Sequence, residues 1–324
     1  MLSSDFCIQF AHSAYQLEAC YRASGAPQEE LAQCFQTWTR EETAARIGEA
    51  EVLVVSGFWD NGLLQGAEKL KFIQVCAAGY DQFDQAALKA RGIKLANSSG
   101  VNMRAVSDHA MALLLSLTRK LHEARDNQAK QFWRPMISDI SAREDELAGK
   151  RILIYGLGKI GQRLARLAKA FEMEVVGVRR SVVNLPEGVD RLIAPDKVLG
   201  ELPSCDVAVL TCPLTSETRG VANAAFFSAL PDSAYFINVA RGGCADEAAL
   251  VEALGSGRIA GAGIDTTVEE PLASSSPLWG MSNVILTPHT AGETQAYERN
   301  VIGFLAGNLG RLKDGVSPLV NEII

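Results

Sequence analysis

The sequence lacks an apolar run long enough to cross a membrane, and no basic segment followed by an apolar stretch opens it. It also has no block of Lys and Arg residues, and its formal net charge is −7. An acidic chain without a basic block argues against a nucleic-acid or membrane-surface partner. We therefore expect a cytoplasmic protein that acts on a small molecule.

No C-x-x-C pair occurs among the seven cysteines, which are odd in number and scattered along the chain. Zinc sites and disulfide frameworks need recurring spacings, so we expect reduced, mostly buried thiols and no metal site. Hydrophobic residues make up 48% of the 324 residues and charged residues 21%, as in globular proteins with substantial cores. This length allows one large domain or two ordinary ones.

Apolar runs rich in β-branched residues alternate with helix-like stretches such as residues 161–171 and 247–253. This alternation predicts an α/β protein whose parallel sheets are covered by helices. A dinucleotide-binding fold starts at its first strand, so the residues before Val101 are expected to form a separate α/β unit. The predicted strands are residues 52–55, 72–75, 93–96, 152–155, 175–178, 207–210, 235–239 and 284–286.

A G-x-G-x-x-G pattern stands between one of these strands and a helical stretch, at Gly156, Gly158 and Gly161. In this context the first glycine permits a tight turn, the second admits a pyrophosphate and the third lets the helix pack on the strand. The amides near Lys159 and Ile160 and the helix dipole would then face the phosphates. The pattern predicts a dinucleotide site.

The acidic residue that binds the adenosine ribose in NAD-preferring domains, about twenty residues beyond the glycines, is missing. Glu174 opens the next strand and therefore lies at its wrong end. The strand ends in Arg179, Arg180 and Ser181. Arg179 can pair with a 2′-phosphate while the other two add charge and a donor, which predicts preference for NADP(H). The alternative is that Arg179 stacks on adenine and NAD(H) still binds.

Three later strand ends carry residues that could perform chemistry. Arg241 follows one, Asp265 and the pair Glu269–Glu270 follow the next, and His289 follows a third. Arginine can hold a carboxylate, histidine can transfer a proton near neutral pH, and a carboxylate can orient the imidazole. Together with a nicotinamide, this set suits the reduction of 2-oxo acids.

Nearly the whole chain resembles the D-isomer-specific 2-hydroxyacid dehydrogenase family, which includes glyoxylate/hydroxypyruvate reductases, D-lactate dehydrogenases and 3-phosphoglycerate dehydrogenases. Besides the glycine pattern, five ordered motifs carry the resemblance, at residues 70–81, 92–97, 213–220, 238–242 and 287–292. Two departures concern residues 265–267, Asp-Thr-Thr where the family usually has Asp-Val-Phe, and residues 107–109, Ser-Asp-His where it has Ala-Glu-His.

The resemblance implies that Arg241 binds the substrate carboxylate and 2-oxo oxygen, and that His289 is the acid/base. Glu270, directly before Pro271, would pair with His289, and the amides of Ala78 and Gly79 would complete the carboxylate site. Asp265 would bind the nicotinamide carboxamide. Further cofactor contacts are expected at Cys212, Pro213, Thr218, Val239, Ala240, His289 and Gly292.

The resemblance also implies two Rossmann-like or flavodoxin-like domains with parallel sheets and an active site in the cleft between them. Residues 1–97 plus 293–324 would form a discontinuous substrate-binding domain, to which a C-terminal helix at 294–312 returns. Residues 98–292 would form the dinucleotide-binding domain. Hinges are expected near residues 97–102 and 290–293.

Residues 101–122 read as one long helix that is apolar nearly all round at 110–117. Such a helix is either a core helix of one subunit or a two-fold interface, and we expect a homodimer in which Trp133 reaches the neighbouring cleft. Residues 56–59 either line the pocket for the substrate side chain or pack as a surface loop.

The sequence thus predicts an oxidoreductase that transfers a hydride between NADP(H) and a small 2-oxo or 2-hydroxy acid, with glyoxylate or hydroxypyruvate as the favoured substrate. One alternative is an NAD(H)-dependent dehydrogenase of another D-2-hydroxy acid. Another is a non-enzymatic dinucleotide-sensing protein similar to the corepressors of this family. A formate dehydrogenase is a third, but such enzymes carry glutamine where Glu270 stands.

Overall fold

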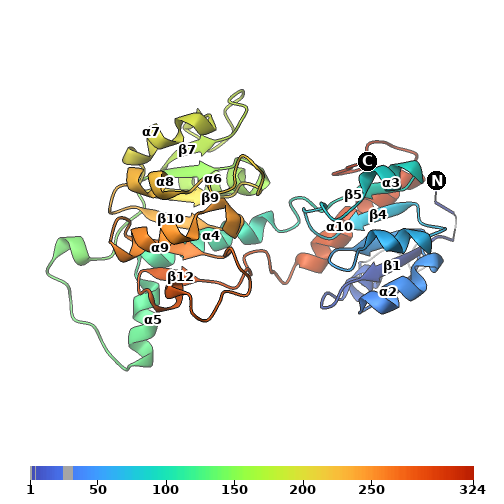
Figure 1. Ribbon diagram of the computed structural model, residues 1–324, viewed down its shortest axis with the longest axis horizontal. Coiled ribbons are helices and arrows are strands. Elements are labelled where there is room, and N and C mark those ends of the chain that lie inside the picture. The colour runs from blue at the N-terminus through green and yellow to red at the C-terminus, as the bar shows by residue number, and fades with distance from the viewer. Residues whose placement is uncertain (1, 4, 25–31) are drawn as a thin grey trace. The chain divides into compact units, whose positions relative to one another are not determined.

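The protein divides into two compact α/β units in a computed structural model that describes residues 2–3, 5–24 and 32–324 (Figure 1). Unit 1 comprises Met1–Asn102 and Thr294–Ile324, and unit 2 comprises Met103–Glu293. Each unit is built on a parallel sheet, which confirms the predicted fold class. Among the described residues, no helix has both the length and the apolar character needed to span a membrane.

Unit 1 contains a five-stranded sheet in the order β2-β1-β3-β4-β5. Its central strands β3 and β4 are buried at every position, which is why they are recognised in the sequence as mainly apolar runs, with Gln74 the one polar residue among them. The edge strand β2, with the sequence QCFQT, is too polar to be recognised in this way. The bounds are β1 Cys7–Ala11, β2 Gln33–Thr37, β3 Val52–Val55, β4 Phe72–Val75, β5 Lys94–Ala96, α1 Leu17–Arg22, α2 Arg40–Arg46 and α3 Gln85–Ala90.

The last helix, α10 (Tyr297–Lys313), belongs to unit 1 although it follows the whole of unit 2 in sequence. Val301 and Leu305 bury their side chains in the unit 1 core. Asn308, fully buried, donates from Nδ2 to Gln74 Oε1 on β4 at 2.9 Å. The backbone amide of Val320 donates to Asn308 Oδ1 at 2.7 Å, so one buried amide ties helix, sheet and C-terminal segment together.

Unit 2 contains a seven-stranded sheet in the order β12-β11-β10-β9-β6-β7-β8. The chain builds outward from β6 in one direction and then returns to β9 on its other side, so the strand order reverses between β6 and β9. Ligands of such sheets bind at the carboxyl ends of the strands beside this reversal. The strand bounds are β6 Arg151–Tyr155, β7 Glu174–Val178, β8 Arg191–Ile193, β9 Val207–Leu210, β10 Tyr235–Asn238, β11 Gly261–Ile264 and β12 Val284–Leu286.

The segment predicted as one helix at residues 101–122 is two helices, α4 (Met103–Thr118) and α5 (Leu121–Ala129). Lys120 separates them in a left-handed conformation with φ of 50°. The apolar face ends at Leu117, and α5 buries none of its side chains, so no buried apolar contact of its own keeps α5 in line with α4. The remaining helices of unit 2 include α6 Lys159–Ala170, α7 Val198–Glu201, α8 Ala224–Ala229 and α9 Glu247–Gly255.

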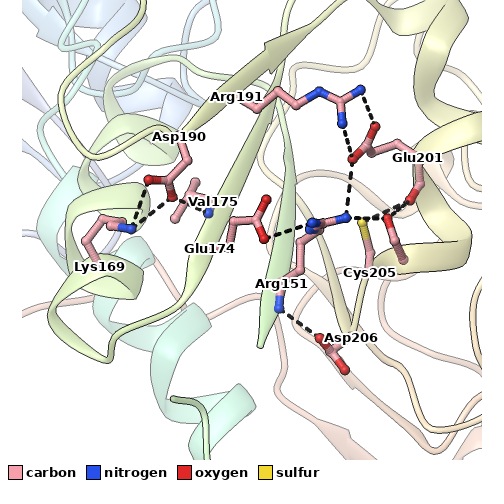
Figure 2. A network of polar contacts seen from close by, with 10 residues as sticks. Arg151, Lys169, Glu174, Val175, Asp190, Arg191, Glu201, Cys205 and Asp206 are labelled. Atoms are coloured by element: carbon pink, nitrogen blue, oxygen red, sulfur yellow. Dashed lines mark hydrogen bonds and ion pairs between the residues drawn. The ribbon is translucent and has the colours of Figure 1, made fainter. Parts of the chain in front are cut away.

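The amino ends of β6, β7 and β8 are held by a network of charges (Figure 2). Arg151 donates to Glu174 at 2.8 Å, and Arg191 contacts the buried Glu201 at 2.8 Å. A cofactor would bind at the carboxyl ends of these strands. Glu174 is paired with Arg151 at the opposite, amino ends, so it is not available to that cofactor.

Asp190 lies beside the same network and accepts from the Val175 amide at 2.8 Å and from Lys169 at 2.9 Å (Figure 2). Burial alone would raise the pKa of the Asp190 carboxyl. The Val175 amide and the Lys169 ammonium outweigh burial and hold that pKa below its ordinary value. The contacts therefore favour the ionised carboxylate, which joins the segment before β8 to β7 and α6.

Candidate active site

The glycine turn after β6 brings three backbone segments into contact. Gly156 has φ of 107°, and a Cβ on it would lie 2.7 Å from Cys212 Cα. A Cβ on Gly161 would lie 2.0 Å from the carbonyl oxygen of Gly156. Both positions exclude any other residue, so α6 packs directly on the turn and the turn packs directly on the segment after β9.

The same turn leaves the N-terminus of α6 open. Gly158 is the N-cap, and a Cβ built there would have no atom within 4 Å. Gly158 and Lys159 are exposed, while Ile160 is half-buried. Phosphates bind to the backbone N–H groups and the positive dipole end at a helix N-terminus. The first turn of the twelve-residue helix α6 can be approached over Gly158, so it is suited to bind the phosphates of a dinucleotide.

The end of β7 carries the two arginines expected at the adenosine side. Arg179 turns back on its own loop and donates to the carbonyl oxygens of Ser181, Val183 and, at 2.8 Å, Asn184. The side chain of Arg180 is 85% exposed and lies 3.7 Å from Glu217. Arg179 therefore shapes the loop, and Arg180 presents its charge to solvent.

The segment after β9 is a closed turn. Thr218 donates from Oγ1 to the Pro213 carbonyl at 2.6 Å and accepts from the Thr215 amide at 2.7 Å. Cys212 is buried, with Sγ 4.0 Å from Cys244 Sγ. The Thr218 hydroxyl thus holds the wall of the glycine turn in place.

Arg241 is exposed at the end of β10 and is positioned by a residue that the sequence analysis did not single out. Asn238 is 2% exposed, accepts from the Ala240 amide at 3.1 Å and donates to the Arg241 carbonyl at 3.2 Å. Arg241 itself donates from Nη1 to the Ala240 carbonyl at 2.7 Å. The sequence signal that could have identified Asn238 is a polar residue directly after the apolar residues of a predicted strand, because such a residue, if buried, must be hydrogen-bonded.

Gly242 joins the arginine turn to the loop after β11. A Cβ on Gly242 would lie 2.0 Å from both the carbonyl carbon and the carbonyl oxygen of Thr267. The two backbones are therefore as close as a glycine allows, and the segment carrying Arg241 packs on the segment that leads to Glu270.

Asp265, 3% exposed, organises the loop after β12. Its Oδ1 accepts from Thr287 Oγ1 at 2.6 Å, from the Thr290 amide at 3.0 Å and from the Ala291 amide at 3.1 Å. His109 of α4 completes the group through Nε2, which lies 2.9 Å from Thr287 Oγ1. The sequence analysis assigned no role to Thr287 or His109.

His289 and Glu270 form a pair, with His289 Nδ1 2.8 Å from Glu270 Oε2. Glu270 Oε1 accepts from the Thr267 amide at 3.1 Å, so both carboxylate oxygens are held. His289 has φ of +56°, and its amide donates to the Asp265 carbonyl at 2.8 Å. With Nδ1 directed to a carboxylate, Nε2 is the ring atom left to exchange a proton with a ligand.

A cavity of 470 Å³ lies beside this pair. Polar and apolar residues contribute equally to its lining, but most of the surface that faces the cavity is apolar. This composition suits a small organic ligand oriented by a few polar contacts. The lining residues are Asp265, Thr267, Glu270, Pro271, Leu272, Trp279, Leu286, Thr287, Pro288 and His289.

The remaining residues predicted for the site do not line this cavity. Val239 and Ala240 are buried beneath the arginine turn, and Gly292 follows the loop held by Asp265. Ala78 and Gly79 belong to unit 1 and are exposed. Within residues 56–59, Trp59 is buried and stacks on Phe83 with ring centroids 5.0 Å apart, so its side chain packs in the unit 1 core.

Residues 111–291 match the family model described as the NAD-binding domain of D-isomer specific 2-hydroxyacid dehydrogenases. A glyoxylate reductase of Thermococcus gammatolerans is 34% identical over 295 residues, which cover 87% of this chain and 86% of that one. A D-3-phosphoglycerate dehydrogenase of Archaeoglobus fulgidus is 33% identical over 88% of this chain, which spans about half (53%) of that relative.

A solved structure of similar fold is the NADPH-dependent glyoxylate/hydroxypyruvate reductase of Sinorhizobium meliloti in complex with NADP and malonate. It has a TM-score of 0.76 and 26% identity, over 99% of this chain and 97% of that one. Two-unit architecture and parallel sheets are therefore shared with an enzyme whose structure contains the cofactor.

The contact at Gly242 predicts a mutational effect. Gly242→Ala should lower the free energy of unfolding by about 1–3 kcal/mol, because the methyl group overlaps the Thr267 backbone and forces the turn that carries Arg241 away from the loop after β11. Gly243→Ala is the matched control, since its Cβ would meet the ends of flexible side chains, Leu214 at 3.1 Å and Arg219 at 3.6 Å, and not backbone. Thermal unfolding of both variants checks this, and equal stability of the two would contradict it.

Proposed function

The chain belongs to the D-isomer-specific 2-hydroxyacid dehydrogenase family, and from that premise we propose that it reduces glyoxylate or hydroxypyruvate with NADP(H). The observation that carries the proposal is the His289–Glu270 pair at 2.8 Å, on the sheet whose glycine turn fits a dinucleotide. The oxidoreductase class and a nicotinamide dinucleotide follow from the family. The substrate and the cofactor preference are the proposed parts.

In this proposal Arg241 holds the carboxylate of the 2-oxo acid, and the amides of Ala78 and Gly79 bind the same group. A reduced nicotinamide dinucleotide held at the glycine turn would supply the hydride for the carbonyl carbon and would be left oxidised. His289 donates the proton from Nε2 to the carbonyl oxygen, which gives the 2-hydroxy acid, and Glu270 stabilises the charged imidazole beforehand. Small monocarboxylates fit best because the chain shows no arginine cluster for a phosphate in these motifs.

Replacement of His289 tests this assignment. His289→Ala should lower kcat by roughly 10²–10⁴-fold, the usual contribution of a positioned acid/base. Arg241→Ala should raise KM because it removes carboxylate binding, and lower kcat because Arg241 would also bind the 2-oxo oxygen, where negative charge develops in the transition state. Steady-state kinetics with glyoxylate and NADPH measure both effects.

The adjacent carboxylates provide a matched control. Glu270→Gln should lower kcat, whereas Glu269→Gln should leave it near the wild-type value, since Glu270 contacts His289. Near-normal turnover by His289→Ala at neutral pH would refute the mechanism. Failure of the wild-type chain to oxidise either NADPH or NADH with any of a panel of 2-oxo acids would favour a non-enzymatic dinucleotide sensor instead. Turnover of formate would favour the formate dehydrogenase alternative.

Preference for NADP(H) is proposed from the arginines after β7 and from the use of Glu174 at the far end of that strand. The NADP-containing relative of similar fold supports it. Arg179 orders the loop, and with Arg180 and Ser181 it would surround the 2′-phosphate.

Charge reversal separates the two cofactors. Arg179→Asp and Arg180→Asp should each weaken NADPH by roughly tenfold or more while NADH changes less, because only NADPH loses an attraction and meets a repulsion. Glu174→Gln, at the other end of the strand, is the control. Dissociation constants for both cofactors measure the effect. Wild-type kcat/KM for NADH equal to or above that for NADPH would overturn the preference.

A homodimer is also proposed. Its contact surface is placed on the segment after α5 and not on the helix predicted at residues 101–122. The apolar residues of α4, such as Leu113 and Leu117, are buried in the core of their own unit. A group of exposed apolar side chains follows α5, which leaves the body of unit 2 in Figure 1. They are Phe132 (55% exposed), Trp133 (95%), Met136 (99%) and Ile140 (79%).

Light scattering at micromolar concentration should give about twice the 34.8 kDa mass of the chain. The double variant Trp133→Asp, Met136→Asp should give the single-chain mass, because a charge at each position opposes burial of the segment after α5 in a subunit interface. The exposed Val183→Asp, outside this segment, should remain dimeric. A single-chain mass for the wild type would defeat the proposal.

A further inference from the structure

The segment after β4 presents two backbone amides to solvent. Ala78 and Gly79 are exposed, and within the described part of the chain neither N–H group is donated to a protein acceptor. The start of the segment is fixed, because the Ser98 amide donates to the Ala77 carbonyl at 3.0 Å and Ser98 Oγ to the Val75 carbonyl at 2.7 Å. Exposed and unpaired amides on a fixed segment are suited to bind an anion.

One side chain fixes the peptide between Ala78 and Gly79. Asn97, 5% exposed at the end of β5, donates from Nδ2 to the Ala78 carbonyl at 2.7 Å. That carbonyl and the Gly79 N–H belong to one planar trans peptide unit, in which they point in opposite directions. Holding the carbonyl on buried Asn97 therefore turns the Gly79 N–H away from the core.

Asn97 is itself held on three sides. Its Oδ1 accepts from the Ser99 amide at 3.1 Å, which fixes which end of the side-chain amide faces Ala78. Its backbone amide donates to the Asn321 carbonyl at 3.2 Å, and Asn321 Nδ2 donates to the Asn97 carbonyl at 3.3 Å. The donor to Ala78 is thus rigid before any ligand arrives.

We propose that Asn97 is a positioning residue for the substrate: through the Ala78 carbonyl it aims the Gly79 N–H at the carboxylate of the 2-oxo acid. This inference rests on the proposed function, in which these amides bind that carboxylate. Asn97 does not touch the reacting atoms. Its effect is to set the direction of a charge-assisted hydrogen bond that is made equally in the ground state and the transition state.

Asn97→Ala tests the proposal by a split between kinetic parameters. KM for glyoxylate should rise roughly 10- to 100-fold, the value of one hydrogen bond to a charged group, while kcat changes little. Binding of oxalate to the NADPH-loaded protein, measured by calorimetry, should weaken by a similar factor. The dissociation constant for NADPH should stay within about twofold, because the residues proposed to bind it lie in unit 2.

Two further variants separate positioning from structural damage. Asn97→Leu keeps the side-chain volume without the donor and should behave like Asn97→Ala; the thermal unfolding midpoint shows whether each variant is folded. Asn321→Ala removes two hydrogen bonds from the same cluster, to the Asn97 and Ser99 carbonyls, but leaves the Asn97–Ala78 contact. Its KM should stay near the wild-type value.

The outcomes distinguish this inference from the function beneath it. An unchanged KM in folded Asn97 variants, an equal rise in Asn321→Ala, or a parallel loss of NADPH affinity would each overturn the positioning role alone. A wild-type chain that reduces no 2-oxo acid would overturn the proposed function and this inference with it. A raised KM and weaker oxalate binding confined to the Asn97 variants would establish the role.

Discussion

The arrangement of the candidate site in unit 2 depends on the buried carboxylate of Asp265. It collects hydrogen bonds from the Thr287 hydroxyl and the Thr290 and Ala291 amides, and its own carbonyl accepts the His289 amide. A buried charge is tolerated only when such donors surround it. Because those donors all come from residues 287–291, satisfying Asp265 also sets the path of that loop, including the left-handed backbone that presents His289 to Glu270.

The same principle recurs at each group that would face a ligand. Asn238 holds the backbone on both sides of the bond between Ala240 and Arg241, and Asn97 holds the Ala78 carbonyl. Asp265, Asn238 and Asn97 are nearly inaccessible, at 3%, 2% and 5% exposure, and each follows or ends an apolar strand. Apart from the Thr287 hydroxyl on Asp265, the hydrogen bonds cited for these three side chains go to backbone groups, so they fix loops whose exposed side chains or amides remain available.

The sequence was sufficient for features that depend on local pattern. Strands such as β3, β4 and β9 are buried on both faces and were predicted at their observed bounds from apolar runs alone. The glycine turn followed from spacing, since Gly156 and Gly161 admit no Cβ. The break at Lys120 could not be predicted, because no proline or glycine marks it and its cause is the end of the buried face of α4. The edge strand β2 could not be predicted either, because its sequence, QCFQT, contains no apolar run.

Side-chain direction was the other property beyond reach of the sequence. Arg179 and Arg180 are adjacent and chemically identical, yet one donates to the carbonyls of its own loop and the other extends into solvent. Glu269 and Glu270 differ as well, but here the resemblance had named Glu270 as the carboxylate that pairs with His289, and the structure has that contact. Which of two neighbours reaches a ligand is decided by backbone direction. In the case of Glu270, that direction is set where Gly242 meets the Thr267 carbonyl and the Thr267 amide reaches Glu270. The resemblance had already assigned Glu270, directly before Pro271, to His289, and this tertiary backbone contact is the physical reason that its carboxylate lies there.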